Sequence, residues 1–125
     1  MTSTWTAQEL DSIGAADEID IAPQRPDGSL GRFTTIWIIR VGDDLYIRSY
    51  RGADGGWYRA VQRTHIARVR GAGSEHDVTL DDAPEVDPVT VHDAYRAKYG
   101  SSIYVDAMVA PPSTSTTLRL QPLND

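Results

Sequence analysis

The stretch from residue 33 to residue 51 constrains the fold most, because two runs of strand-forming residues flank a short polar turn. The first run, Phe33–Val41, carries apolar side chains at both odd and even positions, which is typical of a strand covered on both faces. Gly42-Asp43-Asp44 supplies a turn, and Leu45–Arg51 returns with strand-like alternation. The pattern predicts a long β-hairpin whose first strand is central in its sheet.

The return strand changes character along its length. Leu45 and Ile47 are apolar, whereas Ser49 and Arg51 are polar and are predicted on the same face, with Arg48 on the opposite one. A face that changes from apolar to cationic is typical of the mouth of a pocket.

Two longer helices are predicted from signals at their ends. The capping-box pattern Thr6-Ala-Gln-Glu9 predicts a helix over residues 7–16, since the two side chains can satisfy each other's backbone donors. Asp87-Pro88 is typical of a helix start and Tyr99-Gly100 of a stop, which predicts a second helix over residues 88–99.

The other apolar runs predict further strands and an antiparallel sheet. These strands are expected near residues 18–23, 66–70, 76–80 and 116–120. Residues 103–109 are apolar but fit either a strand or a helical turn. The elements do not alternate as βαβ units, and short hairpin connections favour antiparallel pairing. The predicted fold is therefore α+β, a barrel of about six antiparallel strands with peripheral helices, in one domain over residues 1–125.

Composition and charge exclude several classes of function. The net charge of −6 argues against nucleic acid as a partner, because such binding requires a broad basic surface. The chain has no cysteine, which excludes disulfides and thiolate metal sites. No signal peptide and no apolar run long enough to cross a bilayer are found, so we expect a cytoplasmic protein that does not bind membranes.

The basic residues gather in the middle of the chain. Residues 32–71 hold eight arginines and three acids, whereas both flanks are acidic. The turn Arg51–Gly56 leads into a predicted short helix over 57–63, where flexible backbone and free N–H groups suit phosphate or carboxylate. Arg51, Arg59 and Arg63 could converge there on a small anionic ligand. The alternative is that these arginines pair with acidic residues on the surface.

The histidines and serines give weaker signals. His65, His76 and His92 lack the spacing of metal ligands, so no metal is predicted. Ser49 lacks the surroundings of a nucleophile and is expected to be a binding or structural hydroxyl.

Five motifs carry a family resemblance that spans nearly the whole chain. They are Trp5-x4-Leu10, Thr35-Ile-Trp-Ile-Ile-Arg-Val-Gly-Asp-Asp-Leu-Tyr-Ile-Arg-Ser49, Gly56-Trp-Tyr-Arg59, Tyr95-Arg-Ala-Lys-Tyr-Gly100 and Thr117-Leu-Arg-Leu120. Through them the chain resembles the uncharacterised bacterial family DUF2255. The order of hairpin, helix and strand is also similar to the flavin-binding split β-barrels, which include pyridoxamine-phosphate oxidases and deazaflavin-dependent nitroreductases.

The second resemblance implies a cofactor and a set of binding residues. It implies a six-stranded antiparallel split barrel, a homodimer, and a nucleotide cofactor, either FMN or a deazaflavin coenzyme, in an oxidoreductase-like protein of unknown substrate. The residues that correspond to the phosphate-binding stretch are Arg40, Ser49, Arg51, Trp57 and Arg59. The serine-rich, lysine-bearing motif of the FMN oxidases is replaced by Gly-Gly-Trp-Tyr. A non-enzymatic module that binds a small anionic ligand, or acts only as a homodimer, is the alternative.

Overall fold

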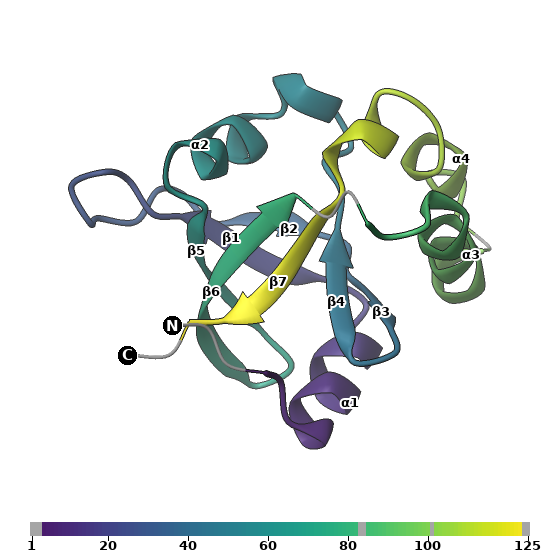
Figure 1. Cartoon of the computed structure of the whole chain (residues 1–125), viewed down its shortest axis with the longest axis horizontal. Coiled ribbons are helices and arrows are strands. Elements are labelled where there is room, and N and C mark those ends of the chain that lie inside the picture. The colour runs from purple at the N-terminus through teal and green to yellow at the C-terminus, as the bar shows by residue number, and fades with distance from the viewer. Residues whose placement is uncertain (1–3, 83–84, 101, 124–125) are drawn as a thin grey trace.

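The computed structural model describes residues 4–82, 85–100 and 102–123, which form a curled antiparallel sheet with helices around it (Figure 1). The helices are α1 (Ala7–Ala15), α2 (Gly56–Thr64), α3 (Pro88–Tyr99) and α4 (Val105–Met108), with 3₁₀ turns η1 (Gly52–Asp54) and η2 (Ser113–Thr116). The strands are β1 (Ile19–Pro23), β2 (Thr34–Ile36), β3 (Ile39–Val41), β4 (Asp44–Ile47), β5 (Ile66–Gly71), β6 (Ser74–Asp82) and β7 (Leu118–Pro122).

The sheet is curled so that its two edge strands, which are not paired with each other, lie close together. Its order is β2-β1-β5-β6-β7-β4-β3, and every neighbouring pair is antiparallel. Only Trp37 and Ile38 separate β2 at one edge from β3 at the other. Because two residues span so little distance, the sheet must curl until its edges are neighbours. The α+β split-barrel prediction is confirmed.

The strand predicted over Phe33–Val41 is divided, so the sheet has seven strands in place of six. The prediction that this strand is central is wrong, since its two halves form the edges. At the break, the Lys98 amine donates to the Ile38 carbonyl over 2.6 Å, and the Tyr99 hydroxyl oxygen lies 3.1 Å from the same carbonyl oxygen. The Ile38 N–H donates to the Tyr99 hydroxyl. Side chains of α3 thus supply backbone contacts that a neighbouring strand would otherwise make at this point.

Burial on both faces, as predicted for this segment, is confirmed by two apolar clusters. Ile36 and Ile38 belong to the main core inside the curled sheet. Ile39, with Trp37 and Val41 packed against it, belongs to a second cluster between the outside of the sheet and α3. The apolar residues at both odd and even positions of this segment therefore belong to two separate packing layers.

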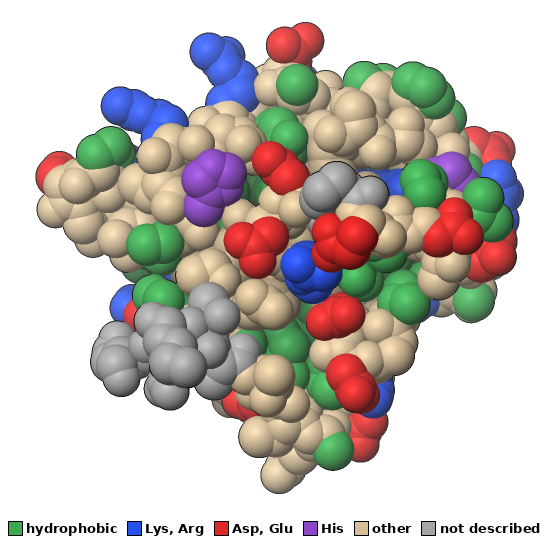
Figure 2. Space-filling model, viewed as in Figure 1, with side chains coloured by type: hydrophobic (Ala, Val, Ile, Leu, Met, Phe, Trp, Pro, Cys, Tyr) green, Lys and Arg blue, Asp and Glu red, His purple; other side chains and the backbone are tan. Residues whose placement is uncertain are grey.

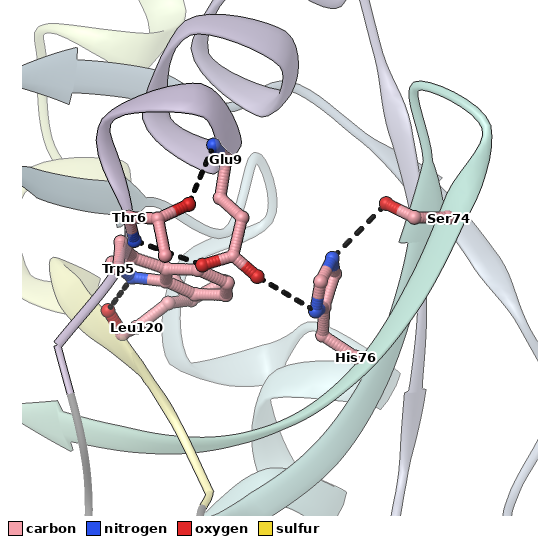
Figure 3. A network of polar contacts seen from close by, with 6 residues as sticks. All are labelled: Trp5, Thr6, Glu9, Ser74, His76 and Leu120. Atoms are coloured by element: carbon pink, nitrogen blue, oxygen red, sulfur yellow. Dashed lines mark hydrogen bonds and ion pairs between the residues drawn. The ribbon is translucent and has the colours of Figure 1, made fainter.

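Helix α1 is tied to the sheet by polar contacts at its first turn (Figure 3). The predicted capping box is present: Glu9 N donates to Thr6 Oγ1, and Thr6 N donates to Glu9 Oε1. The indole N–H of Trp5 donates to the Leu120 carbonyl on β7 over 2.9 Å. Glu9 Oε2 also lies 3.7 Å from His76 Nδ1 on β6. The N-terminal segment is therefore held by two distant strands.

The other predicted elements follow the sequence closely. Helix α1 ends one residue before the predicted limit and α3 spans the predicted residues, with Asp87 accepting from Val89 N as its cap. The question left open for residues 103–109 is answered by the short helix α4.

The surface of the fold is mixed in charge. Figure 2 shows acidic side chains spread over the face that carries β6 and β7, while basic side chains project at the α2 end. In the ranges that the structure describes, no helix has both the length and the apolar character to span a membrane.

Candidate functional site

A cleft of about 490 Å³ opens between β2, the segment after β4, and α4. Residues 34–37 bound it on one side, and residues 48–51 with the start of α2 bound it on another. Tyr104 and Met108 complete the lining from the α4 side. The volume falls within the roughly 300–1,000 Å³ typical of small-molecule sites.

Arg48 is the most unusual residue of the cleft, because its side chain is almost completely buried. It is 1% exposed, and its Nε donates to Thr117 Oγ1 over 2.8 Å while its Nη1 donates to the Met108 carbonyl over 2.9 Å. Its Nη2 is also buried and has no hydrogen-bond partner among the described residues. The guanidinium is thus held in place by two hydrogen bonds, and one of its nitrogens has no hydrogen-bond partner among the described residues.

No counter-charge accompanies this buried guanidinium. In the described ranges no carboxylate forms an ion pair with Arg48. Burial lowers the pKa of the guanidinium, an effect that the nearby Tyr95 phenol partly opposes. An arginine nevertheless keeps its proton in proteins. Arg48 therefore brings to the cleft wall a positive charge that no carboxylate among the described residues balances, although its guanidinium carbon lies 5.7 Å from the centre of the Tyr95 ring.

Ser49 provides a second buried polar atom without a partner. Its backbone N–H donates to Thr116 Oγ1 over 2.9 Å, which fixes the residue. Its own Oγ is buried and makes no hydrogen bond within the described part of the chain. A Cβ added at Gly55 would collide with this oxygen. The absence of a side chain at Gly55 thus leaves room for the Ser49 hydroxyl.

The start of α2 adds backbone donors beside these two side chains. Gly55 is the N-cap, and no side chain caps the helix there. Gly55, Gly56 and Trp57 all line the cleft. The first N–H groups of a helix have no partner within it, and they carry the positive end of the helix dipole. The cleft therefore combines a guanidinium, a hydroxyl and a helix N-terminus, each of which suits an anion.

Aromatic rings make up much of the remaining wall. Trp37 lines the cleft and stacks on Tyr99, with ring centroids 3.9 Å apart and an interplanar angle of 5°. Trp57 lines the opposite part, while Tyr50 and Tyr104 contact each other edge to face. Such surfaces suit a flat ring.

The structure brings together three of the five site residues predicted from the sequence. Ser49, Arg51 and Trp57 line the cleft. Arg40 lies outside the lining: it is the middle residue of β3, and its side chain pairs with Asp11 on α1 over 2.7 Å. Arg59 is exposed on α2 and is also outside the lining, since two residues along a helix correspond to a rotation of about 200° from Trp57.

Sequence reasoning missed Arg48 as a cleft residue. Strand alternation placed it on the face opposite Ser49, but β4 ends at Ile47, so the alternation no longer applies to the residues that follow. Leu45, Tyr46 and Ile47 are all buried. The run of large side chains at both odd and even positions directly before Arg48 is the sequence signal that could have indicated that this arginine is buried.

The comparisons with known proteins agree with this fold. Residues 9–120 match the model of the family described as "Uncharacterized protein conserved in bacteria (DUF2255)". The chain belongs to this family. No curated protein sequence matches it significantly.

Solved structures of the same fold include proteins named for different cofactors. The heme-storage protein HutZ of Vibrio cholerae has a TM-score of 0.63 at 8% identity, covering 98% of this chain and 93% of that one. An FAD-binding protein of Mesorhizobium loti has a TM-score of 0.57 at 14% identity, covering 100% and 94%. An F420 reductase has a TM-score of 0.53 at 16% identity, covering 92% and 93%. At identities of 8–16%, these likenesses show that this DUF2255 chain shares its fold with these proteins.

Proposed function

We propose that the cleft binds an anionic cofactor with a flat aromatic ring, of the flavin or deazaflavin class, and that the protein is oxidoreductase-like. The observation that carries the proposal is that two consecutive residues each have a buried polar side-chain atom without a hydrogen-bond partner among the described residues: Nη2 of Arg48 and Oγ of Ser49. Both atoms belong to residues that line one cleft.

The free energy of burying a charge explains why Arg48 points to an anion. A buried ion without a partner costs several kcal/mol, and a protein keeps such a group only where something offsets that cost. The two hydrogen bonds of Arg48 go to neutral oxygens and leave the charge unbalanced. A phosphate at Nη2 would supply both the acceptor and the counter-charge.

The residues present fit a phosphate-bearing ring. Arg48, Ser49 and the first N–H groups of α2 would hold the phosphate, with Arg51 as an exposed additional cation. Trp37 and Trp57 would face the ring. A flavin or deazaflavin supplies hydride-transfer chemistry when bound. The shared fold with an F420 reductase and an FAD-binding protein supports this class of ligand.

The alternative function is a non-enzymatic module that binds a small anionic ligand. The same Arg48 and Ser49 atoms support it, because they indicate an anion without indicating a ring. The two functions differ in whether the aromatic wall contributes to affinity.

Fluorescence titration with FMN, FAD and a deazaflavin coenzyme tests the proposal. We expect binding at micromolar concentrations and a loss of about tenfold or more in affinity for Arg48→Met, since a hydrogen bond to a charged group contributes about 1.5–3 kcal/mol. Arg63→Met, which removes an exposed arginine outside the cleft lining, is the control for net charge.

The outcomes separate the two functions. Stabilisation by inorganic phosphate without binding of any ring cofactor would favour the non-enzymatic module. If neither phosphate nor any of the three cofactors binds, the anion site itself is refuted.

We also propose that the protein forms a homodimer. Tyr50 and Tyr104 are 53% and 54% exposed at the cleft, and the neighbouring Ile103 is 84% exposed. A second copy that covered this apolar surface would also shield the cleft from water. Sedimentation equilibrium checks this, and a monomer at all concentrations would contradict it.

A further inference from the structure

The same cleft contains a carboxylate whose charge is opposite to that of its arginines. Glu18 lines the cleft and is exposed to solvent. Among the described residues it forms neither an ion pair nor a side-chain hydrogen bond, although Arg48 and Arg51 line the same cleft. An ion pair between Glu18 and one of these arginines would partly cancel both charges. Because no such pair forms among the described residues, both charges remain available to a ligand.

The backbone holds Glu18 beside the aromatic wall. Ile19 on β1 pairs with Ile36 on β2, so the next antiparallel positions along the two chains are Glu18 and Trp37. The carbonyl of Asp17 accepts a hydrogen bond from the Tyr99 hydroxyl over 2.7 Å. Because Tyr99 also stacks on Trp37, one tyrosine fixes both the indole and the residue before Glu18.

We propose that Glu18 and Trp37 form a second subsite, which binds a protonated amine or a strong N–H donor. The inference rests on the proposed anion site, because it assigns other residues that line the same cleft. The ligand, or a cofactor and substrate together, would then carry a negative group at Arg48 and a positive or donor group at Glu18.

The chemistry of the two side chains supports a cation at this position. A carboxylate accepts charge-assisted hydrogen bonds from ammonium groups. The face of an indole ring attracts cations through its quadrupole, and tryptophan is the most effective ring for this. Thr34 and Thr35 also line the cleft and carry no positive charge that would compete with the ligand, and the Thr35 hydroxyl donates to Asp20 Oδ1 over 2.7 Å.

Alkyl phosphates and ω-aminoalkyl phosphates of increasing chain length are suitable probes. Both series place a phosphate at Arg48, and only the second can reach Glu18 with an ammonium group. Isothermal titration calorimetry measures the ratio of the two affinities at each length. We expect one chain length at which the amine improves affinity by about two- to fivefold, the range for an exposed ion pair.

Glu18→Gln should abolish this preference, so that the amine no longer improves affinity at any chain length. Asp17→Asn is the matched control, since it removes one negative charge from the adjacent exposed residue, which is not among the lining residues. It should retain the preference. Glu18→Asp should preserve part of it, with a shift toward a longer probe.

The possible failures can be told apart. If alkyl phosphates bind but the amine improves affinity at no length, or if Glu18→Gln changes nothing, the second subsite is refuted and the anion site stands. If no alkyl phosphate binds to the unmodified protein, the anion site fails and the subsite inferred from it fails too.

Discussion

Replacing Ser49 with alanine should stabilise the ligand-free protein, although most substitutions of buried residues destabilise. The Ser49 side chain is 1% exposed, and its Oγ has no partner in the described part of the chain. Alanine removes this hydroxyl without breaking any hydrogen bond that Oγ makes. The backbone bond from Ser49 N to Thr116 Oγ1 is retained.

The expected gain follows from two opposing contributions. A buried polar group without a partner costs about 1–3 kcal/mol, which alanine recovers. The void left by one oxygen costs roughly 0.5 kcal/mol at the usual cost per unit of cavity volume. The unfolding free energy should therefore rise by about 1 kcal/mol, and the melting temperature by about 3–5 °C for a chain of this size.

Urea denaturation in a buffer without phosphate, sulfate or carboxylate measures this difference, because a bound anion would stabilise only the unmodified protein. Ser113→Ala is the matched control. Ser113 is equally buried, but its Oγ donates to the Tyr50 carbonyl over 3.2 Å. Losing that bond should lower the unfolding free energy by about 1 kcal/mol.

The two serines should thus respond in opposite directions. If Ser49→Ala destabilises the protein as much as Ser113→Ala does, Oγ has a partner in solution and the argument for a vacant anion-binding hydroxyl is refuted. In phosphate buffer the advantage of Ser49→Ala should shrink, since only the unmodified protein offers that hydroxyl to the anion.

Three further predictions concern other parts of the structure. Gly55→Ala should lower the unfolding free energy by about 1–2 kcal/mol through the clash with Ser49 Oγ, and adding Ser49→Ala should remove most of that loss in a double-mutant cycle; purely additive effects would contradict the clash. Burial lowers the pKa of Lys98 to about 8, below its unfolded value of about 10.4, so between these pH values the unfolded chain binds more protons and stability rises with pH. Relative to Lys98→Met, the protein should therefore gain up to about 1 kcal/mol from pH 8 to pH 10 after allowance for solvent screening, and parallel pH profiles would disprove this. Trp5→Phe removes the donor to the Leu120 carbonyl and should cost about 1–2 kcal/mol in urea denaturation, whereas an unchanged midpoint would show that this bond adds nothing.

Local signals in the sequence were sufficient for most of the elements. The capping box at Thr6 and Glu9 and the Asp87-Pro88 start each depend on residues within one helical turn, so they are readable without the rest of the fold. The apolar residues on both faces of Phe33–Val41 likewise indicated that this segment is buried in two packing layers. Pairing partners are not local, and so the sequence did not reveal that this segment forms both edges of the sheet.

The candidate site was predicted only where its residues are close in sequence. Ser49, Arg51 and Trp57 fall within one turn and helix start, and the structure brings them to one cleft. Whether Arg59 reaches the cleft depends on its angular position on α2, and Arg40, in the middle of β3, pairs instead with Asp11 on α1. The burial of Arg48 depends on where β4 ends and on a hydroxyl and a carbonyl partner about 60–70 positions away in the sequence.

The sequence by itself determined the α+β class, the helix limits and the presence of a cationic, glycine-rich turn, since these follow from short-range patterns of polarity and backbone preference. Only the tertiary structure decided which cation is buried, which hydroxyl lacks a partner among the described residues and which carboxylate lines the same cleft. The physical reason is that burial and hydrogen-bond satisfaction depend on atoms brought together from distant parts of the chain.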